Sequence, residues 1–236
     1  MRRSRRAVSS LSRPDHLTAW FVRLTLPRLY AILDIDLLAA RQLPPLDVLD
    51  AWLECGVRLV QVRAKSLTMG PMLGIAESVG RRAASAGATL FVNDRADVAR
   101  LAGADGVHLG QDDLSPLDAR RILSPDQLVG LSTHNLAQVR AAVELAEGET
   151  ADYVAIGPVS ATSTKAQPDP VVGLAGVRDA STLTKGAGTP LVAIGGITLE
   201  SAPGVISSGA DSVAVISDLL TGDWRTRAAL YLQALH

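Results

Sequence analysis

Two carboxylates, Asp94 and Asp113, each follow a short apolar run of the chain, Leu90–Val92 and Val107–Leu109 respectively. The helical stretch Ala96–Ala102 separates the two runs, which predicts two parallel strands joined by a helix. Neighbouring parallel strands end side by side, so we expect both carboxylates on the face where α/β proteins keep their chemistry. Carboxylate oxygens are preferred ligands of Mg²⁺. The sequence therefore predicts a magnesium site at Asp94 and Asp113.

A second segment carries an amide and two cations at every other position, namely Gln61, Arg63 and Lys65. Alternate residues of a strand point to the same side, so these three side chains can face one ligand. Such a group indicates an anionic ligand, most simply a phosphate or diphosphate. The alternative is a set of solvated or ion-paired charges at a strand end.

Hydroxyl groups, a histidine and a lysine follow two later apolar runs. The segment Ser132–Asn135 contains His134, although a loop histidine is more often a cap or a hydrogen-bonding residue. Thr162–Lys165 lies in a long loop from Gly157 to about Gly173. Its hydroxyls and lysine suit closure over a phosphate, unless the loop is simply solvated.

Paired glycines, Gly195-Gly196, and the segment Ile216-Ser217 follow the last two apolar runs. Glycine lets the backbone approach a ligand closely, and backbone N–H groups at these positions form the usual phosphate site of β/α barrels. A tight turn that needs glycine for its φ angle is the alternative.

Eight apolar runs of strand length alternate with helical patterns along the chain. This order predicts an α/β fold, a single (β/α)₈ TIM barrel. An open doubly wound sheet is less favoured, because no Gly-x-Gly-x-x-Gly follows the first run. The expected strands are Leu29–Leu33, Leu59–Val62, Thr89–Val92, Val107–Leu109, Leu128–Leu131, Tyr153–Ile156, Leu191–Ile194 and Ser212–Ile216. The expected helices include Leu46–Cys55, Pro71–Ala86, Pro116–Leu123, Leu136–Ala146, Leu174–Leu183, Leu199–Ser208 and Trp224–Leu235.

The first 28 residues differ from the rest of the chain. They are rich in Arg and Ser and lack the apolar core that a signal peptide needs. We expect residues 1–28 to be a short flexible N-terminal extension rather than an interaction arm, and residues 29–236 to form the barrel.

Composition and charge fit a cytoplasmic protein that binds neither nucleic acid nor a membrane. The net charge of −1 argues against nucleic acid as a partner, and no apolar run has the length of a membrane span. The single cysteine, Cys55, cannot form an internal disulfide, which fits a reducing compartment. The oligomeric state does not follow from the sequence.

Seven motifs of the chain, in order and with similar spacing, resemble those of thiamine-phosphate synthases. They are Gln61–Lys65, Asn93–Arg95, Gly106–Asp113, Gly130–His134, Thr162–Lys165, Ala193–Ile197 and Val215–Ser217. The resemblance runs from about Leu29 to the C-terminus. It implies that a hydroxymethylpyrimidine diphosphate is joined to a thiazole phosphate, or to its carboxylate, with Mg²⁺ and release of pyrophosphate.

The resemblance also implies residue roles. Asp94 and Asp113 would hold Mg²⁺ on the diphosphate. Catalytic roles are implied for Arg63, Lys65, Ser132 and Lys165. The pyrimidine diphosphate would be bound by Gln61, Arg63, Lys65, Asn93, Ser132 and Lys165. The thiazole phosphate would be bound by Thr162, Thr164, Gly196, Ile216 and Ser217. Val62, Ala64 and Ser163, which lie within the same motifs, would also bind substrate.

The chain departs from the family pattern in a few places. Ala64 stands where the family has Glu, and alternation along the strand predicts that it faces away from the ligand. Ala161 and Ser163 stand where the family has Pro, which would loosen the loop.

Three other functions remain open. A thiazole tautomerase would use His134 for proton transfer but would need no diphosphate site. A non-catalytic paralogue would bind thiamine precursors without turnover. A generic phosphosugar barrel would share the last phosphate site, but it would not predict Asn93-Asp94 together with Thr162–Lys165.

Overall fold

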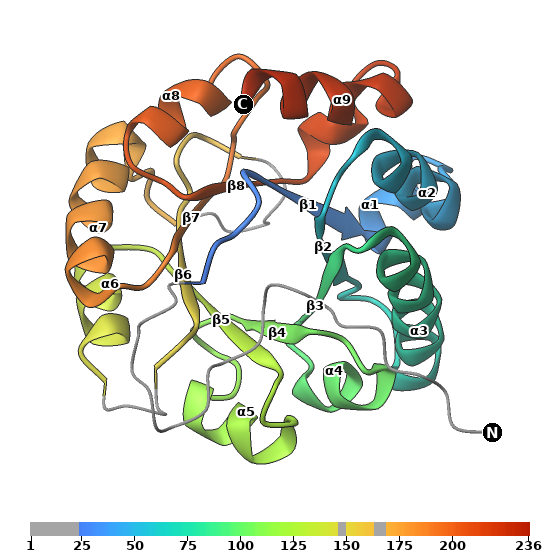
Figure 1. The fold of residues 1–236 in the computed structure, drawn as a ribbon, viewed down its shortest axis with the longest axis horizontal. Coiled ribbons are helices and arrows are strands. Elements are labelled where there is room, and N and C mark those ends of the chain that lie inside the picture. Colours follow the sequence, from blue (N-terminus) through green and yellow to red (C-terminus); the bar gives the residue numbers. More distant parts are fainter. Residues whose placement is uncertain (1–23, 146–149, 163–168) are drawn as a thin grey trace.

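Eight parallel strands form a closed barrel in the computed structural model, which describes residues 24–145, 150–162 and 169–236 (Figure 1). Each strand pairs with its neighbours in sequence, and β1 closes the barrel against β8. The strands are β1 (Leu29–Asp34), β2 (Leu59–Arg63), β3 (Thr89–Asn93), β4 (Gly106–Leu109), β5 (Leu128–Thr133), β6 (Tyr153–Ile156), β7 (Leu191–Ile194) and β8 (Ser212–Val215). The predicted TIM barrel is confirmed, and no strand end differs from its expected position by more than two residues.

Helices surround the barrel and cover its outer face (Figure 1). They are α1 (Ile35–Ala40), α2 (Pro45–Cys55), α3 (Met69–Ala86), α4 (Ala96–Ala102), α5 (Pro116–Ile122), α6 (Leu136–Val143), α7 (Gly173–Ala187), α8 (Ala202–Ser207), the 3₁₀ helix η1 (Ser217–Leu220) and α9 (Trp224–Ala234). None of the helices in these described ranges combines the length and hydrophobicity needed to span a membrane.

Two of these helices, α1 and η1, have no counterpart among the expected ones. α1 begins directly after β1, because the Asp34 side chain caps it by accepting a hydrogen bond from Leu37 N at 3.0 Å. α8 begins at Ala202, three residues later than expected. The side chains of Thr198 and Ser201 form a turn before it, in which Thr198 N donates to Ser201 Oγ at 2.9 Å.

Large aromatic side chains fill the inside of the barrel, and small residues make room for them. The ring of Tyr153 lies edge-on to that of Phe91, with centroids 5.3 Å apart. At Gly130 a Cβ atom would lie 2.1 Å from the Tyr153 ring, and at Gly106 it would lie 2.6 Å from Phe91. The inner core therefore depends on a glycine facing each ring.

Carboxylates join pairs of strands at the N-terminal end of the barrel. Asp105, Asp152 and Asp211 each immediately precede an even-numbered strand. Each accepts a hydrogen bond from a backbone N–H of the strand before it, at Leu90, Val129 and Leu191 respectively, at 2.7 to 2.9 Å. These bonds fix the register of the β3–β4, β5–β6 and β7–β8 pairs.

The described end of the predicted N-terminal extension packs against the barrel. Leu26 is buried in the inner core, and Arg28 donates hydrogen bonds from Nη1 to the carbonyls of Ala210 and Asp211. Residues 1–23 lie outside the described residues, so the proposed boundary at residue 28 stays a prediction.

Candidate functional site

A cavity opens at the C-terminal ends of the strands. Its lining combines residues of β1 to β5, β7 and β8 with residues that follow β5, β6, β7 and β8. Predicted ligand-binding residues in this lining are Gln61, Arg63, Asn93, Ser132, Thr162, Gly196, Ile216 and Ser217. Lys65, Asp94 and Asp113 are not among the lining residues. They form a charged group beside Asn93, which itself lines the cavity.

The predicted cations of the second strand are both paired with carboxylates. Arg63 Nη1 lies 2.5 Å from Oδ2 of Asp34, whose side chain is buried. Lys65 forms an ion pair with Asp94. Gln61 points into the barrel and donates a hydrogen bond to the Tyr30 hydroxyl at 2.9 Å. Ion pairing, the alternative considered above, therefore describes these cations here, and their contact with an anionic ligand stays a prediction.

The side chains of Val62 and Ala64 face away from the cavity. Both are buried in the outer core between the strands and the helices. Only the backbone of these two residues can therefore face a ligand. Ala64, the departure from the family pattern noted above, therefore lies in the outer core and does not line the cavity.

The two carboxylates of the predicted metal site are neighbours. Asp113 Oδ2 accepts a hydrogen bond from Gly110 N at 2.7 Å. Partial burial raises the pKa of Asp113, and the adjacent Asp94 carboxyl raises it further. Asp94 itself has a φ of 64° and anchors its backbone N–H on the His108 carbonyl at 2.7 Å.

This pair fits a divalent cation. A carboxyl such as Asp113, whose pKa a neighbouring carboxyl raises, gains from a nearby positive charge, and the hard oxygens of both side chains match Mg²⁺. Within residues 24–145, 150–162 and 169–236 no group of three or more His, Cys, Asp or Glu side chains is placed to hold a metal. The exposed neighbour Asp112 does not share the contacts of Asp113 with Gly110 and Asp94.

A hydrogen-bonded chain crosses the barrel interior and ends at Ser132. Ser132 Oγ lies 2.8 Å from His108 Nε2, and His108 Nδ1 lies 2.8 Å from the Tyr153 hydroxyl. The Tyr153 hydroxyl lies 3.0 Å from that of Tyr30, which accepts from Gln61. Burial raises the pKa values of both tyrosines, so their hydroxyls stay protonated.

Sequence reasoning assigned no role to Tyr30, Asp34, His108 and Tyr153, which all belong to the contacts just described. His108 lies in the Gly106–Asp113 motif at an inward position of β4, where its alternation with Val107 and Leu109 was an available signal. The contact of Tyr153 with His108 joins residues that are 45 positions apart. Such a pairing depends on the barrel register.

The Gly195-Gly196 turn needs glycine at both positions. Gly195 and Gly196 have φ values of 96° and 64°. A Cβ atom on Gly196 would lie 2.5 Å from the Ala161 carbonyl oxygen and 2.7 Å from that of Ser160. The turn after β7 therefore packs against Ser160 and Ala161, which lie just before Thr162 in the loop after β6. Glycine is needed there because it lets two backbone segments approach closely.

The structure describes only part of the predicted ligand-binding segment in the long loop after β6. Thr162 lines the cavity, whereas Ser163, Thr164 and Lys165 lie outside the described residues, so their roles stay predictions. His134 also lines the cavity. Its Nδ1 is 3.0 Å from the Gly157 carbonyl oxygen and 3.4 Å from Asp169 Oδ2, which matches the hydrogen-bonding role expected for a loop histidine.

Comparisons with known proteins agree with this geometry. A model of the thiamine monophosphate synthase family matches residues 29–219. The chain is 48% identical over 217 residues to a thiamine-phosphate synthase of Koribacter versatilis (strain Ellin345), covering 90% of this chain and 98% of the relative. A thiamine-phosphate synthase of Chloroflexus aurantiacus (strain ATCC 29366 / DSM 635 / J-10-fl) is 37% identical over 220 residues, covering 93% of this chain and 94% of the relative.

A solved structure is similar as well. Thiamine phosphate pyrophosphorylase from Pyrococcus furiosus superposes with a TM-score of 0.76 at 31% identity, covering 88% of this chain and 95% of that one. The family match, the extent of the similarity and the shared fold lead to one conclusion: the chain belongs to the thiamine-phosphate synthase family.

Proposed function

We propose that this chain joins 4-amino-2-methyl-5-(diphosphomethyl)pyrimidine to 4-methyl-5-(2-phosphoethyl)thiazole, forming thiamine phosphate and pyrophosphate. With the carboxylate of that thiazole as substrate, CO₂ would be released as well. One observation carries the proposal. A single cavity contains a glycine turn suited to a phosphate and, at its edge, cations beside a carboxylate pair suited to a metal-bound diphosphate.

The diphosphate end of the site is assigned to β2, β3 and β4. Arg63 and Lys65 would exchange their carboxylate partners for diphosphate oxygens, and Asp94 and Asp113 would hold Mg²⁺. The bound ion would supply positive charge for the leaving pyrophosphate. Since the protein provides two carboxylates here, the remaining ligands of the ion would come from the diphosphate and from water.

The phosphate end is assigned to β7 and β8. Gly195 and Gly196, with their positive φ angles, line the same cavity as Ile216 and as Ser217 at the start of η1, and their backbone N–H groups are the proposed donors. Backbone donors of this kind bind phosphate without adding a charge that would compete for the diphosphate.

The bond-breaking step needs charge stabilisation more than proton transfer. The C–O bond to the diphosphate breaks heterolytically, and its electron pair leaves with pyrophosphate. The aminopyrimidine ring delocalises the positive charge left on its methylene carbon. The thiazole nitrogen then attacks that carbon with its lone pair, and because the nitrogen carries no proton, no base is needed.

The protein's own residues would hold this cation and exclude water. Gln61, Asn93 and Ser132 line the cavity and offer amide and hydroxyl groups to the pyrimidine ring. Ser132 is held by His108, so its hydroxyl has a fixed direction before a substrate binds. Lys165 is assigned to the diphosphate through the family resemblance alone.

Turnover with both substrates tests the proposal. Purified protein with the pyrimidine diphosphate, the thiazole phosphate and Mg²⁺ should form thiamine phosphate, and EDTA should stop the reaction. Binding of both substrates without product would instead support the non-catalytic paralogue. Isomerisation of a thiazole phosphate carboxylate without pyrimidine would support the tautomerase, for which His134 is the cavity histidine nearest to a carboxylate, Asp169. A cytoplasmic location is part of the proposal.

A further inference from the structure

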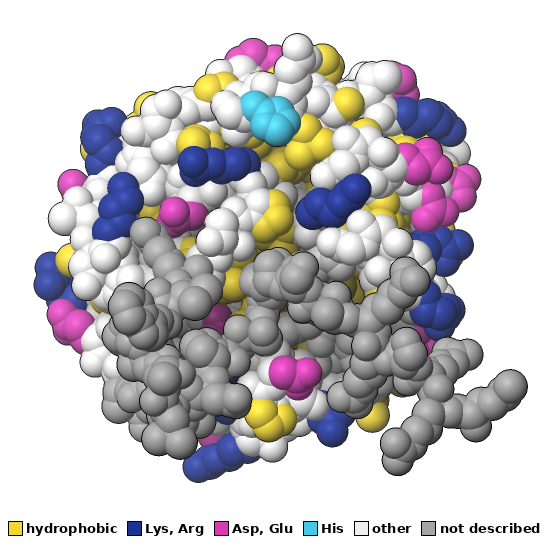
Figure 2. All heavy atoms as spheres, in the orientation of Figure 1, with side chains coloured by type: hydrophobic (Ala, Val, Ile, Leu, Met, Phe, Trp, Pro, Cys, Tyr) yellow, Lys and Arg dark blue, Asp and Glu magenta, His cyan; other side chains and the backbone are white. Residues whose placement is uncertain are grey.

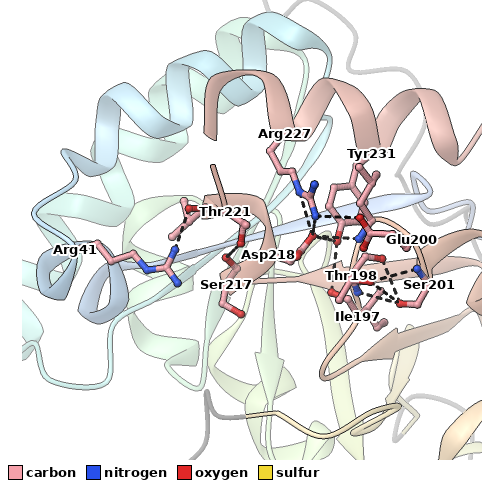
Figure 3. A network of polar contacts seen from close by, with 12 residues as sticks. Arg41, Ile197, Thr198, Glu200, Ser201, Ser217, Asp218, Thr221, Arg227 and Tyr231 are labelled. Carbon is pink, nitrogen blue, oxygen red and sulfur yellow. Dashed lines mark hydrogen bonds and ion pairs between the residues drawn. The ribbon is translucent and has the colours of Figure 1, made fainter. Parts of the chain in front are cut away.

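A largely buried carboxylate, Asp218, joins the two loops of the phosphate end to the last helix (Figure 3). Asp218 lies in η1, directly after Ser217. Its Oδ2 accepts hydrogen bonds from the Tyr231 hydroxyl at 2.6 Å and from Arg227 Nη2 at 2.8 Å, both on α9. The same oxygen accepts from Leu199 N in the loop after β7 at 3.1 Å.

Tyr231 contacts that loop a second time. Its hydroxyl also lies 3.4 Å from the Ile197 carbonyl oxygen, one residue after Gly196. The Tyr231 side chain is fully buried, and burial raises its pKa, so it remains a hydrogen-bond donor. The pair formed by Asp218 and Tyr231 thus links residues on both sides of the proposed phosphate site, beyond the ends of the paired strands β7 and β8.

The negative charge of Asp218 is balanced by the adjacent Arg227. Arg227 gives it two hydrogen bonds, and both side chains are largely buried, at 16% and 17% exposure. The more distant Glu200 is 3.8 Å from Arg227 but 75% exposed. A largely buried carboxylate with a paired guanidinium and two further donors holds a single geometry, because any displacement would leave a charge unsatisfied.

From this arrangement we infer that Asp218 and Tyr231 are positioning residues for the thiazole phosphate. The inference rests on the proposed function. A phosphate bound by backbone N–H groups of two loops requires both loops within about 0.5 Å of the productive geometry. Neither residue touches the cavity, so their effect passes through the backbone of residues 196–199 and 216–217. Arg41, which donates from Nη1 to Leu220 O at 2.9 Å, holds the other end of η1.

Steady-state kinetics of Tyr231→Phe and Asp218→Asn test the inference. Tyr231→Phe keeps the buried ring and removes only the hydroxyl. We expect the KM for the thiazole phosphate to rise about tenfold, with kcat and the KM for the pyrimidine diphosphate changed less than about threefold, as for a loss of binding at one end only. Calorimetric binding of the thiazole phosphate alone should weaken by the same factor.

Two controls separate positioning from general destabilisation. Thr184→Val removes a buried hydroxyl from α7, away from the cavity, and Glu200→Gln removes the exposed charge beside Arg227. Both should retain the wild-type KM values. Equal rises of both KM values in Tyr231→Phe, or weaker thiazole phosphate binding in Thr184→Val, would overturn the inference.

The calorimetric binding measurement also distinguishes failure of this inference from failure of the proposed function. If the wild type binds the thiazole phosphate without turnover and Tyr231→Phe weakens that binding, the positioning role stands although the synthase proposal fails. If turnover is normal and Tyr231→Phe binds the thiazole phosphate like the wild type, the positioning role fails alone. If the wild type neither binds the thiazole phosphate nor turns it over with the pyrimidine diphosphate and Mg²⁺, both proposals fail.

Discussion

Asp94 and Asp113 are the two carboxylates of the proposed cation site. Burial and mutual proximity raise the pKa of Asp113, so its ionised form is disfavoured until a positive charge arrives. Lys65 supplies one such charge through its ion pair with Asp94. A divalent ion would supply more at the same place, since it can bind both carboxylates at once.

The neighbouring residues Asp112 and Asp113 provide a matched test of this site. We expect Asp113→Asn to lower Mg²⁺-dependent turnover by on the order of 10²-fold and to raise the Mg²⁺ concentration at half-maximal rate, because one oxygen ligand loses its charge. Asp112→Asn removes an equal charge from an exposed side chain and should stay within about twofold of wild type. Identical Mg²⁺ titrations for the two variants would contradict the metal assignment.

At the scale of the elements, short connections hold the cavity in shape. α1, which the sequence did not reveal, brings Asp36 against the loop that follows β2. Asp36 accepts hydrogen bonds from the backbone N–H groups of Lys65 and Ser66 at 2.8 and 3.2 Å and from the Ser66 hydroxyl. The segment that carries Arg63 and Lys65 is therefore fixed by a carboxylate from the neighbouring β/α unit.

The hydrogen bonds of the Asp36 carboxylate should make the free energy of unfolding depend on pH. Although burial raises the pKa of Asp36, hydrogen bonds from Ser66 and Lys65 lower it below 3.8 overall. A lowered folded-state pKa stabilises the protein above the unfolded-state value and loses that effect as the pH falls through the folded-state value.

We expect Asp36→Asn to lower the free energy of unfolding by about 1 kcal/mol at neutral pH, through the loss of charge-assisted hydrogen bonds. Urea unfolding should show a constant difference from wild type between about pH 7 and pH 5, which narrows below about pH 4. A difference that widens in acid would show that Asp36 is not stabilised as the ionised form.

Gly196 offers a second test at this scale, with Gly222 as its control. Both have a similar positive φ, 64° and 66°. A Cβ atom added at Gly196 would meet backbone oxygens within 3 Å, whereas one added at Gly222 would meet nothing within 4 Å. Gly222→Ala should cost about 1 kcal/mol of stability from backbone strain alone.

Gly196→Ala should cost more and should also raise the KM for the thiazole phosphate about tenfold or more, because the loops after β6 and β7 must separate. The comparison requires urea unfolding and steady-state kinetics on both variants. Equal effects of the two substitutions would show that the close approach to Ser160 and Ala161 has no functional role.

At the scale of the whole molecule, the cavity depends on the closed barrel because its lining residues come from strands and loops around it. Charged side chains of both signs are interspersed around the face shown in Figure 2, with apolar atoms visible between them. A ligand that bridges several loops binds the folded chain and not the unfolded one, so binding adds to the stability of the entire barrel.

Binding of pyrophosphate, the proposed product, should therefore increase the free energy of unfolding. At about 100 times its Kd, with Mg²⁺ present, it should add about 2.7 kcal/mol to the free energy of unfolding. For a chain of this length the melting temperature should then rise by roughly 5–10 °C. Mg²⁺ alone and pyrophosphate alone should give smaller rises, and the combined rise should shrink in Asp113→Asn. A rise that is the same without Mg²⁺ would contradict a metal-bound diphosphate.

The sequence by itself determined the alternation of strands and helices, because each strand is a short apolar run and each connection has helical periodicity. In a parallel barrel that order alone places every strand end on one face, so Gln61, Arg63, Asn93, Ser132 and Gly196 could be assigned to a common site from the sequence. The family resemblance added Val62, Ala64 and the roles of the loop residues Ser163, Thr164 and Lys165, which stay predictions.

The tertiary structure alone decided which partners these residues have. The Arg63–Asp34 pair and the chain from Ser132 through His108 and Tyr153 each join residues of different β/α units. Asp218, which pairs with Tyr231 within the last unit, also accepts a hydrogen bond from Leu199 of the unit before it. Such contacts depend on the stagger of neighbouring strands and on how far each side chain reaches across the barrel. Neither is encoded in a local pattern, because strand register is set only when the whole sheet closes.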